Sequence, residues 1–416
     1  MINDNFDMTE ETTTFDSEIG QPAASNRICL LLEELADREF SDIQIFPDTD
    51  IYVKDERGFI NRAEDFNENQ PTELEILEAA NIMSYGYPQR KYIETLQKER
   101  NKPRQERNHI VLRPFNIAYE PLERSGRYRI NFSFTETPDP ENFGLSMFIR
   151  RIPPRPWTFE EIGFSGPALK LVSEIEGGSI HNGMILITGP TNCGKSTTAT
   201  SLIHLYTSTF KNLNITTLED PIEFRFVSDK AVIRQMEIGK HVPTLAEGLH
   251  TVLRQDPDII MIQECRDQET ARQAMEAART GHLVIMTIHA YSCADALVKL
   301  SDWIGDPEVV GRYTTFCLAQ LLLKPDRFQA VESVGSVQRR ILVQEVTRPQ
   351  NNPALLDSLR KKESIENISR AIKNSVEEQS FTSSFRNLIA EGKITVKMAL
   401  NHTQDKLTLM SQLTGS

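Results

Sequence analysis

Residues 189–197 read Gly-Pro-Thr-Asn-Cys-Gly-Lys-Ser-Thr, the residue types and spacing of a phosphate-binding loop, or Walker A motif. Backbone N–H groups in such a loop, and at the start of the helix after it, form a positive nest for phosphate oxygens. Lys195 would add a charge near the β- and γ-phosphates, and the Ser196 hydroxyl would bind Mg²⁺. Apolar residues 184–188 predict the strand that must enter the loop, and 197–206 predict the helix that leaves it. The residues expected to contact the nucleotide are Gly189, Thr191, Asn192, Cys193, Gly194, Lys195, Ser196 and Thr197.

Polar side chains end three further apolar segments. Glu219 follows the expected strand at 215–218, Glu264 follows 259–262, and His289 follows 283–288. Ligands of an open parallel sheet bind outside the carboxyl ends of its strands. We therefore expect these three groups beside the phosphate loop.

Phosphoryl transfer needs charge neutralisation, a positioned water and in-line geometry. Glu264 holds the Walker-B position, where it would bind Mg²⁺ through water or polarise the attacking water. Glu219 is a second candidate for that water, although a turn beginning at 220 is a common place for an acid. His289 is expected to donate a hydrogen bond to the γ-phosphate. His282 is a further candidate for contact with the nucleotide, but it is expected near the start of the same strand, on the opposite face, where a histidine is more often structural.

The composition is that of an ordinary globular protein, with 39% hydrophobic and 25% charged residues among 416, enough for two or three domains. The net charge of −13 argues against a protein that coats nucleic acid. No apolar run approaches the roughly 18 residues that span a bilayer, and the acidic N-terminus has no signal-peptide pattern. The five cysteines form no C-x-x-C pair, so neither a zinc site nor a disulfide framework is expected. Scattered, unpaired cysteines of this kind are expected of a protein in the reducing cytoplasm.

The domain boundary is expected at 153–156, Pro-Pro-Arg-Pro, which can continue neither a helix nor a central strand. Beyond it, apolar strands alternate with helical patterns, as in a parallel sheet with crossover helices. The expected divisions are a flexible acidic tail at 1–26, an α+β domain at 27–152, a linker at 153–166, an α/β core at 167–350 and a helical region at 351–416. Within the first domain the patterns predict helices at 28–36 and 72–100 and strands at 42–46, 51–53, 110–112, 128–134 and 145–149.

Four motifs in order resemble those of the secretion ATPase superfamily, which includes type II secretion motors, type IV pilus motors and type IV secretion ATPases. Beside the Walker A loop, 218–223 resembles the family's aspartate box, 254–267 its Walker B and 280–290 its histidine box. The resemblance implies a RecA-like core with a mainly parallel sheet, a PAS-like first domain and Mg²⁺-dependent ATP hydrolysis.

Two arginines of the first domain, Arg129 and Arg150, match the family's N-terminal arginine segments. The resemblance implies that they neutralise phosphate charge, across a cleft in the same chain or from a neighbouring subunit. Either residue is alternatively an ordinary surface residue of a strand.

The chain departs from the family pattern in three places. Gln263 replaces a glycine before the Walker-B acid, which leaves the division of labour between Glu219 and Glu264 open. Asn192 stands in the loop where small residues are usual, but asparagine tolerates left-handed backbone. Cys193, beside Lys195 and a helix N-terminus, is predicted to have a lowered thiol pKa and to be protected by ATP from alkylation.

The resemblance implies a cytoplasmic homohexamer, peripheral at the inner membrane, that couples ATP hydrolysis to a membrane-embedded secretion or pilus machine. Only Cys265, Cys293 and Cys317 lie in and after the Walker B, so the four-cysteine zinc subdomain common in type II secretion and pilus-extension motors is not expected. The long N-terminal block favours a conjugal-transfer or type IVB secretion motor over a type IV pilus retraction motor. The alternatives of other classes are a RecA-like nucleic-acid motor, which the net charge disfavours, and a scaffold that binds ATP without hydrolysing it. No stable nucleic-acid binding is expected.

Overall fold

The computed structural model describes residues 26–35, 40–54, 60–62, 70–85, 87–103, 106, 108, 111–121, 126–136, 143–323, 340–375, 378–403 and 405–414. The chain divides into two compact units, Met1–Pro154 and Arg155–Ser416, and the division falls within the proline-rich stretch. The expected acidic tail lies outside the described residues except for Asn26, whose side chain caps the first described helix, α2 (Arg27–Glu34). No helix in the described ranges is long and apolar enough to cross a membrane.

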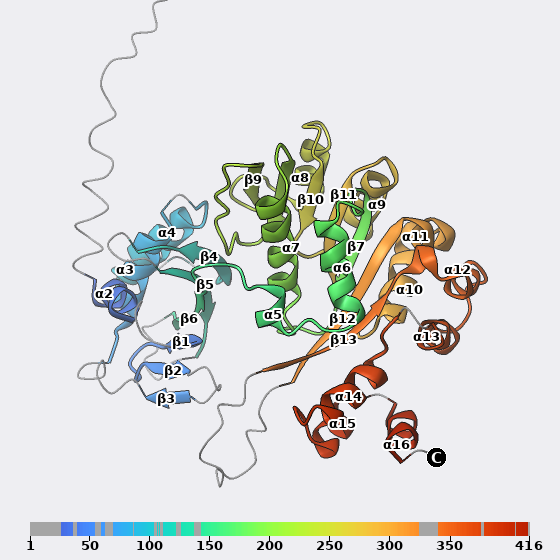
Figure 1. The fold of residues 1–416 in the computed structure, drawn as a ribbon. Helices are drawn as coiled ribbons and strands as arrows, with labels where there is room; N and C mark the ends of the chain where they lie inside the picture. Colours follow the sequence, from blue (N-terminus) through green and yellow to red (C-terminus); the bar gives the residue numbers. More distant parts are fainter. Residues whose placement is uncertain are drawn as a thin grey trace, which may run out of the picture. The chain divides into compact units, whose positions relative to one another are not determined.

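The described strands of the first unit form a six-stranded antiparallel sheet in the order β3-β2-β1-β6-β5-β4 (Figure 1). Alternate residues of its strands are apolar and buried, which gives the sheet one apolar face. That face packs against α2 and two further helices, as expected of an α+β domain. The elements are β1 (Asp42–Ile45), β2 (Tyr52–Lys54), β3 (Ile60–Arg62), α3 (Glu73–Met83), α4 (Arg90–Arg100), β4 (Phe115–Tyr119), β5 (Arg127–Phe134) and β6 (Leu145–Ile152).

Two expectations for this unit differ from the structure. Residues 72–100 form two helices and not one, because α3 ends at Met83 and Pro88 interrupts the helical pattern before α4 begins. The strand expected at 110–112 is absent at 111–112, residue 110 lies outside the described residues, and the strand is instead β4.

In the second unit the described strands form a seven-stranded sheet in the order β13-β12-β7-β11-β10-β8-β9. Neighbouring strands are parallel except for the antiparallel pair β12–β13, which confirms the mainly parallel sheet. The strands are β7 (Gly183–Thr188), β8 (Asn214–Glu219), β9 (Val232–Glu237), β10 (Ile259–Ile262), β11 (Leu283–Ile288), β12 (Thr314–Leu323) and β13 (Ile341–Thr347).

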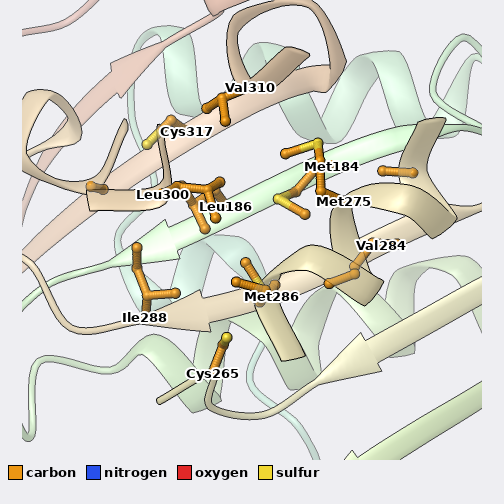
Figure 2. Close-up of a cluster of buried hydrophobic side chains, with 14 of the residues drawn as sticks. Met184, Leu186, Cys265, Met275, Val284, Met286, Ile288, Leu300, Val310 and Cys317 are labelled. Atoms are coloured by element: carbon orange, nitrogen blue, oxygen red, sulfur yellow. The ribbon is translucent and has the colours of Figure 1, made fainter. Parts of the chain in front are cut away.

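Helices cover both faces of this sheet, because the central strands are apolar on both sides. Leu186 and Met286 point to one face, where they meet Met275 and Val310 (Figure 2). Ile185 points to the other face, among side chains of α6 and α7. The helices are α5 (Phe159–Ile162), α6 (Pro167–Glu176), α7 (Lys195–Thr209), α8 (Leu245–Val252), α9 (Gln268–Arg279), α10 (Cys293–Ile304) and α11 (Pro307–Tyr313).

The region after β13 is helical, as expected. Phe385 and Leu409, from the first and last of its three final helices, pack with Val343 of β13 and Leu323 of β12. The helices are α12 (Pro353–Arg360), α13 (Ile365–Lys373), α14 (Phe381–Ala390), α15 (Val396–His402) and α16 (Lys406–Thr414).

Candidate active site

The phosphate loop joins the carboxyl end of β7 to the first residue of α7, Lys195. Gly189, Asn192 and Gly194 have positive φ values of 147°, 63° and 93°. A Cβ on Gly189 would overlap the Gln320 carbonyl and the Cys193 sulfur, so this position requires glycine. The left-handed conformation of Asn192 is the one that the sequence predicts this residue type to tolerate.

The loop fits a bound phosphate. Gly194 at the N-cap has no side chain to cap α7, so the N–H groups of the first turn are not occupied by a capping side chain. Burial lowers the pKa of Lys195, and its Nζ donates hydrogen bonds of 2.9 Å to the carbonyl oxygens of Gly189 and Pro190. A cation and a helix N-terminus therefore face the same loop.

Three of the predicted groups meet at the carboxyl edge of the sheet. The parallel register places Thr188 opposite Ile288, so the loop after β7 and His289 leave the sheet together. Lys195 Nζ lies 3.4 Å from Nδ1 of His289, and Nε2 of that histidine lies 2.7 Å from Oε1 of Glu264. The side chains of Lys195, His289 and Glu264 thus form one continuous polar chain.

The Glu264 carboxylate is kept ionised by its neighbours. Arg266 donates to both of its oxygens, from Nε at 2.9 Å and from Nη2 at 3.0 Å. Burial raises the pKa of Glu264, but hydrogen bonding and charge from Arg266 and His289 outweigh burial and hold that pKa below its usual value. Arg266 belongs to the Walker-B match, but its role as the partner of Glu264 follows only from the fold.

Glu219, the last residue of β8, has the opposite environment. Only 2% of its surface is exposed, and burial raises its pKa to about 7. Thr217 Oγ1 and Gln235 Nε2 donate to its Oε1 at 2.6 and 3.0 Å, which opposes the shift without cancelling it. A carboxyl group with this pKa can take up and release a proton near neutrality, as a general base must.

Gln263, the departure from the family pattern, links the ends of two strands. Its side-chain oxygen accepts a hydrogen bond of 2.5 Å from the backbone N–H of Asp220, which follows β8. Its backbone oxygen accepts from the hydroxyl of Thr287 on β11. The side chain therefore tethers the loops that carry Glu219 and Glu264, a link that glycine could not make.

The structure does not bring His282 to this site. The residue precedes β11, and its ring Nδ1 lies 3.1 Å from the carbonyl oxygen of Ala277 at the end of α9. The whole length of β11 separates it from His289, so within one chain it lies at the amino edge of the sheet. These local hydrogen bonds fit the alternative that His282 has a structural role.

The predicted lowering of the Cys193 thiol pKa is wrong, whereas its protection from alkylation by ATP stays a prediction. The side chain is 2% exposed, and burial raises the pKa of the thiol above its usual value despite the nearby Lys195 charge. Burial removes water from the thiolate, and here that cost exceeds the attraction of the lysine and the loop N–H groups. The five cysteines are all buried, and none of them forms a disulfide.

Arg129 and Arg150 lie directly opposite each other on β5 and β6 of the first unit. Arg150 Nε also pairs with Asp42 Oδ1 at 2.8 Å. Arg129 lies between the buried Tyr128 and Ile130, and Arg150 follows the buried Ile149, so both arginines occupy the polar face of the sheet, away from the helices. The two cations are thus presented by one surface.

The described residues contain no group of three or more His, Cys, Asp or Glu side chains suited to hold a metal ion. A Mg²⁺ ion that arrives with a nucleotide suits this arrangement, because phosphate oxygens and water molecules together supply most of its ligands. Ser196 and, through water, Glu264 are the protein groups that the sequence predicts to bind it.

Residues 129–405 match the model of the type II/IV secretion system protein family. The chain belongs to this family. The type IV pilus retraction ATPase PilT of Pseudomonas aeruginosa, a curated relative, is 40% identical over 176 residues, which are 42% of this chain and 47% of that protein. This member of the family spans about half the length of the curated relatives it matches.

Solved structures have the same fold. The pilus retraction motor PilT with bound ADP has a TM-score of 0.69 and 25% identity, over 92% of this chain and 97% of that one. The Legionella pneumophila ATPase DotB has a TM-score of 0.63 and 23% identity, over 94% of this chain and 97% of that one. The secretion ATPase fold extends over both units.

Proposed function

We propose that this chain is an ATPase that hydrolyses ATP at the carboxyl edge of the second sheet. The observation that carries the proposal is the polar chain from Lys195 through His289 to Glu264, built onto a phosphate loop. Membership of a family whose relatives are named ATPases supports it. The structure of PilT with ADP supports nucleotide as the ligand.

Mg²⁺-ATP, when bound, supplies the transferred phosphoryl group and part of its charge neutralisation. Lys195 turns its ammonium from the loop carbonyls towards phosphate oxygens, and Ser196 offers its hydroxyl to Mg²⁺. Glu264, ionised by Arg266, orients water, and Glu219 accepts the proton of the attacking water. His289, between Lys195 and Glu264, connects the state of the phosphate loop to the Walker-B acid.

At the level of the cell, the proposal is a homohexamer at the cytoplasmic side of the inner membrane that drives a conjugal-transfer or type IVB secretion machine. The fold shared with DotB agrees with this reading. Pilus retraction is the second candidate, and the higher TM-score and identity of the PilT structure favour it. Each machine would be a partner of the chain.

The substitution Glu264→Gln tests the hydrolytic role. It keeps the size of the side chain but removes the charge, so we expect turnover to fall by about 100-fold or more while ATP binding persists. Glu276→Gln, which breaks an exposed ion pair with Arg279 on α9, is the control and should behave as the wild type. Wild-type turnover in Glu264→Gln would refute the assignment. Strong stimulation of the wild type by single-stranded DNA would favour the nucleic-acid motor instead.

A further inference from the structure

Glu345 is a carboxylate buried in the second unit, outside all four nucleotide motifs. It lies on β13, where 7% of its surface is exposed, and burial raises its pKa. Burial of a carboxylate is costly unless hydrogen bonds compensate for the lost water. The partners that compensate for it therefore indicate what the residue holds together.

These partners are the first N–H groups of two helices. Glu345 Oε1 accepts a hydrogen bond of 2.7 Å from the backbone N–H of Cys293, where α10 begins. The backbone N–H of Phe381, where α14 begins, also faces the carboxylate and lowers its pKa. The first N–H groups of a helix have no partner within it and carry partial positive charge. One carboxylate thus serves two helix N-termini.

The first of these helices anchors the loop that carries His289. Only three residues separate His289 from α10, and the loop is fixed at two other points. Thr188 Oγ1 donates to the Ala290 carbonyl at 3.0 Å, and Lys299 Nζ donates to the His289 carbonyl at 2.9 Å. A displacement of the start of α10 would therefore shift the histidine against Glu264.

The second helix begins the C-terminal group α14–α16. Backbone hydrogen bonds between Val346 and Gln379, and a bond from Gln344 N to Ser384 Oγ, join the start of α14 to β13. Phe385 of α14 and Leu409 of α16 pack into the same cluster as Val343. The position of α14 on β13 therefore determines the packing of the whole group.

We propose that Glu345 is a positioning residue that ties the His289 loop to the C-terminal helices, so that nucleotide at the site and the packing of α14–α16 change together. The link goes beyond hydrolysis, because it gives the nucleotide site a mechanical output at the end of the chain. Its turnover readout rests on the proposed function, whereas its binding readout needs only nucleotide binding.

A carboxylate suits this role because each of its two oxygens can accept hydrogen bonds. Glu345→Gln keeps the volume but turns an amide NH₂ towards one of the two N–H groups, which releases one helix. Gln344→Leu is the matched control. That neighbour is equally buried on the same strand, and its side-chain amide has no hydrogen-bond partner among the described residues.

The native cysteines are buried, so a cysteine introduced at Leu407, which is 87% exposed on α16, can be labelled with a fluorescent maleimide. In this labelled protein we expect ADP to change the emission. In Glu345→Gln the emission response should be lost, kcat should fall about tenfold with KM unchanged, and ADP affinity should stay within about twofold. Glu345→Asp should restore part of the response, and Gln344→Leu should match the unsubstituted protein.

A Glu345→Gln protein that melts earlier but keeps the emission response and kcat would show a purely structural role and overturn the inference. The absence of an ADP response in the unsubstituted labelled protein would also overturn it. A protein that responds to ADP but does not hydrolyse ATP would refute the proposed function and leave the link supported.

Discussion

Two glutamates at one edge of a sheet have opposite environments. Arg266 and His289 hold the pKa of Glu264 below its usual value, whereas burial raises the pKa of Glu219 to about 7. Groups whose surroundings separate their pKa values in this way take different roles in acid–base chemistry. The sequence left this division open because both residues follow apolar strands. The environments favour Glu219 as the base and Glu264 as the fixed charge.

The pH dependence of turnover should report Glu219. A base works when ionised, so kcat should rise as the pH increases through about 7. Gln235→Met removes the amide that donates to the carboxylate, which destabilises the ionised form, so the midpoint should move to higher pH. The measurement is kcat against pH, with Gln268→Met on α9 as a control. An unmoved midpoint in Gln235→Met would contradict this assignment of the base.

The same burial has a cost in stability. Because the pKa of Glu219 is raised in the folded chain, its folded form binds a proton that the unfolded form releases between about pH 4.5 and 7. Its contribution to the free energy of unfolding is therefore present at low pH and lost as the pH rises through this window. Glu219→Gln should raise the free energy of unfolding in urea by about 1–3 kcal/mol at pH 8, with little change at pH 4.5, while turnover is lost. Equal effects at the two pH values would contradict this explanation.

At the scale of elements, the sequence predicted the strands that are marked by an apolar run and end at a functional residue. The apolar runs of β7, β10 and β11 end at chemistry-bearing residues, so the sequence was enough to predict that Lys195, Glu264 and His289 lie at one edge of the sheet.

Strand β9 was missed because it is the edge strand and most of its residues are partly exposed, so no apolar run marks it. Gln235 on that strand and Glu345 on β13 act through partners distant in sequence, which only the fold reveals. The direction of the Cys193 pKa shift was mispredicted because burial of that side chain is a tertiary property.

The phosphate loop gives an element-scale prediction. Gly189→Ala combines a positive φ with overlap of Gln320 and Cys193 atoms, so it should abolish nucleotide binding and lower the melting temperature. Gly239→Ala is the control, because its φ of 78° is also positive but nothing lies within 4 Å of the added Cβ. That variant should lose only about 1 kcal/mol and keep binding ADP. Binding by Gly189→Ala equal to that of the control would show that the overlap is tolerated.

At the scale of the whole molecule, the open prediction is that two arginines of the first unit neutralise phosphate charge. Arg129 and Arg150 belong to the first unit, and the phosphate loop belongs to the second. In a ring, each subunit presents one surface to a neighbour and a different surface to the next, so the arginines can serve their own chain or an adjacent one. Arg129→Gln alone should lower kcat in either case, and Arg90→Gln, which breaks an exposed ion pair on α4, is the control.

Mixing two inactive variants distinguishes these arrangements. Glu264→Gln chains keep their arginines but lack the Walker-B acid, and Arg129→Gln chains have the reverse defect. If the arginine acts on its own chain, each chain carries a defect in its own site and the mixture stays inactive. If it acts on a neighbour, an equal mixture should regain about a quarter of wild-type turnover, because a quarter of adjacent pairs combine an intact acid with an intact arginine. We expect the second result, in line with the proposed homohexamer. Turnover that stays at the level of the separate variants after subunit exchange would assign the arginine to its own chain.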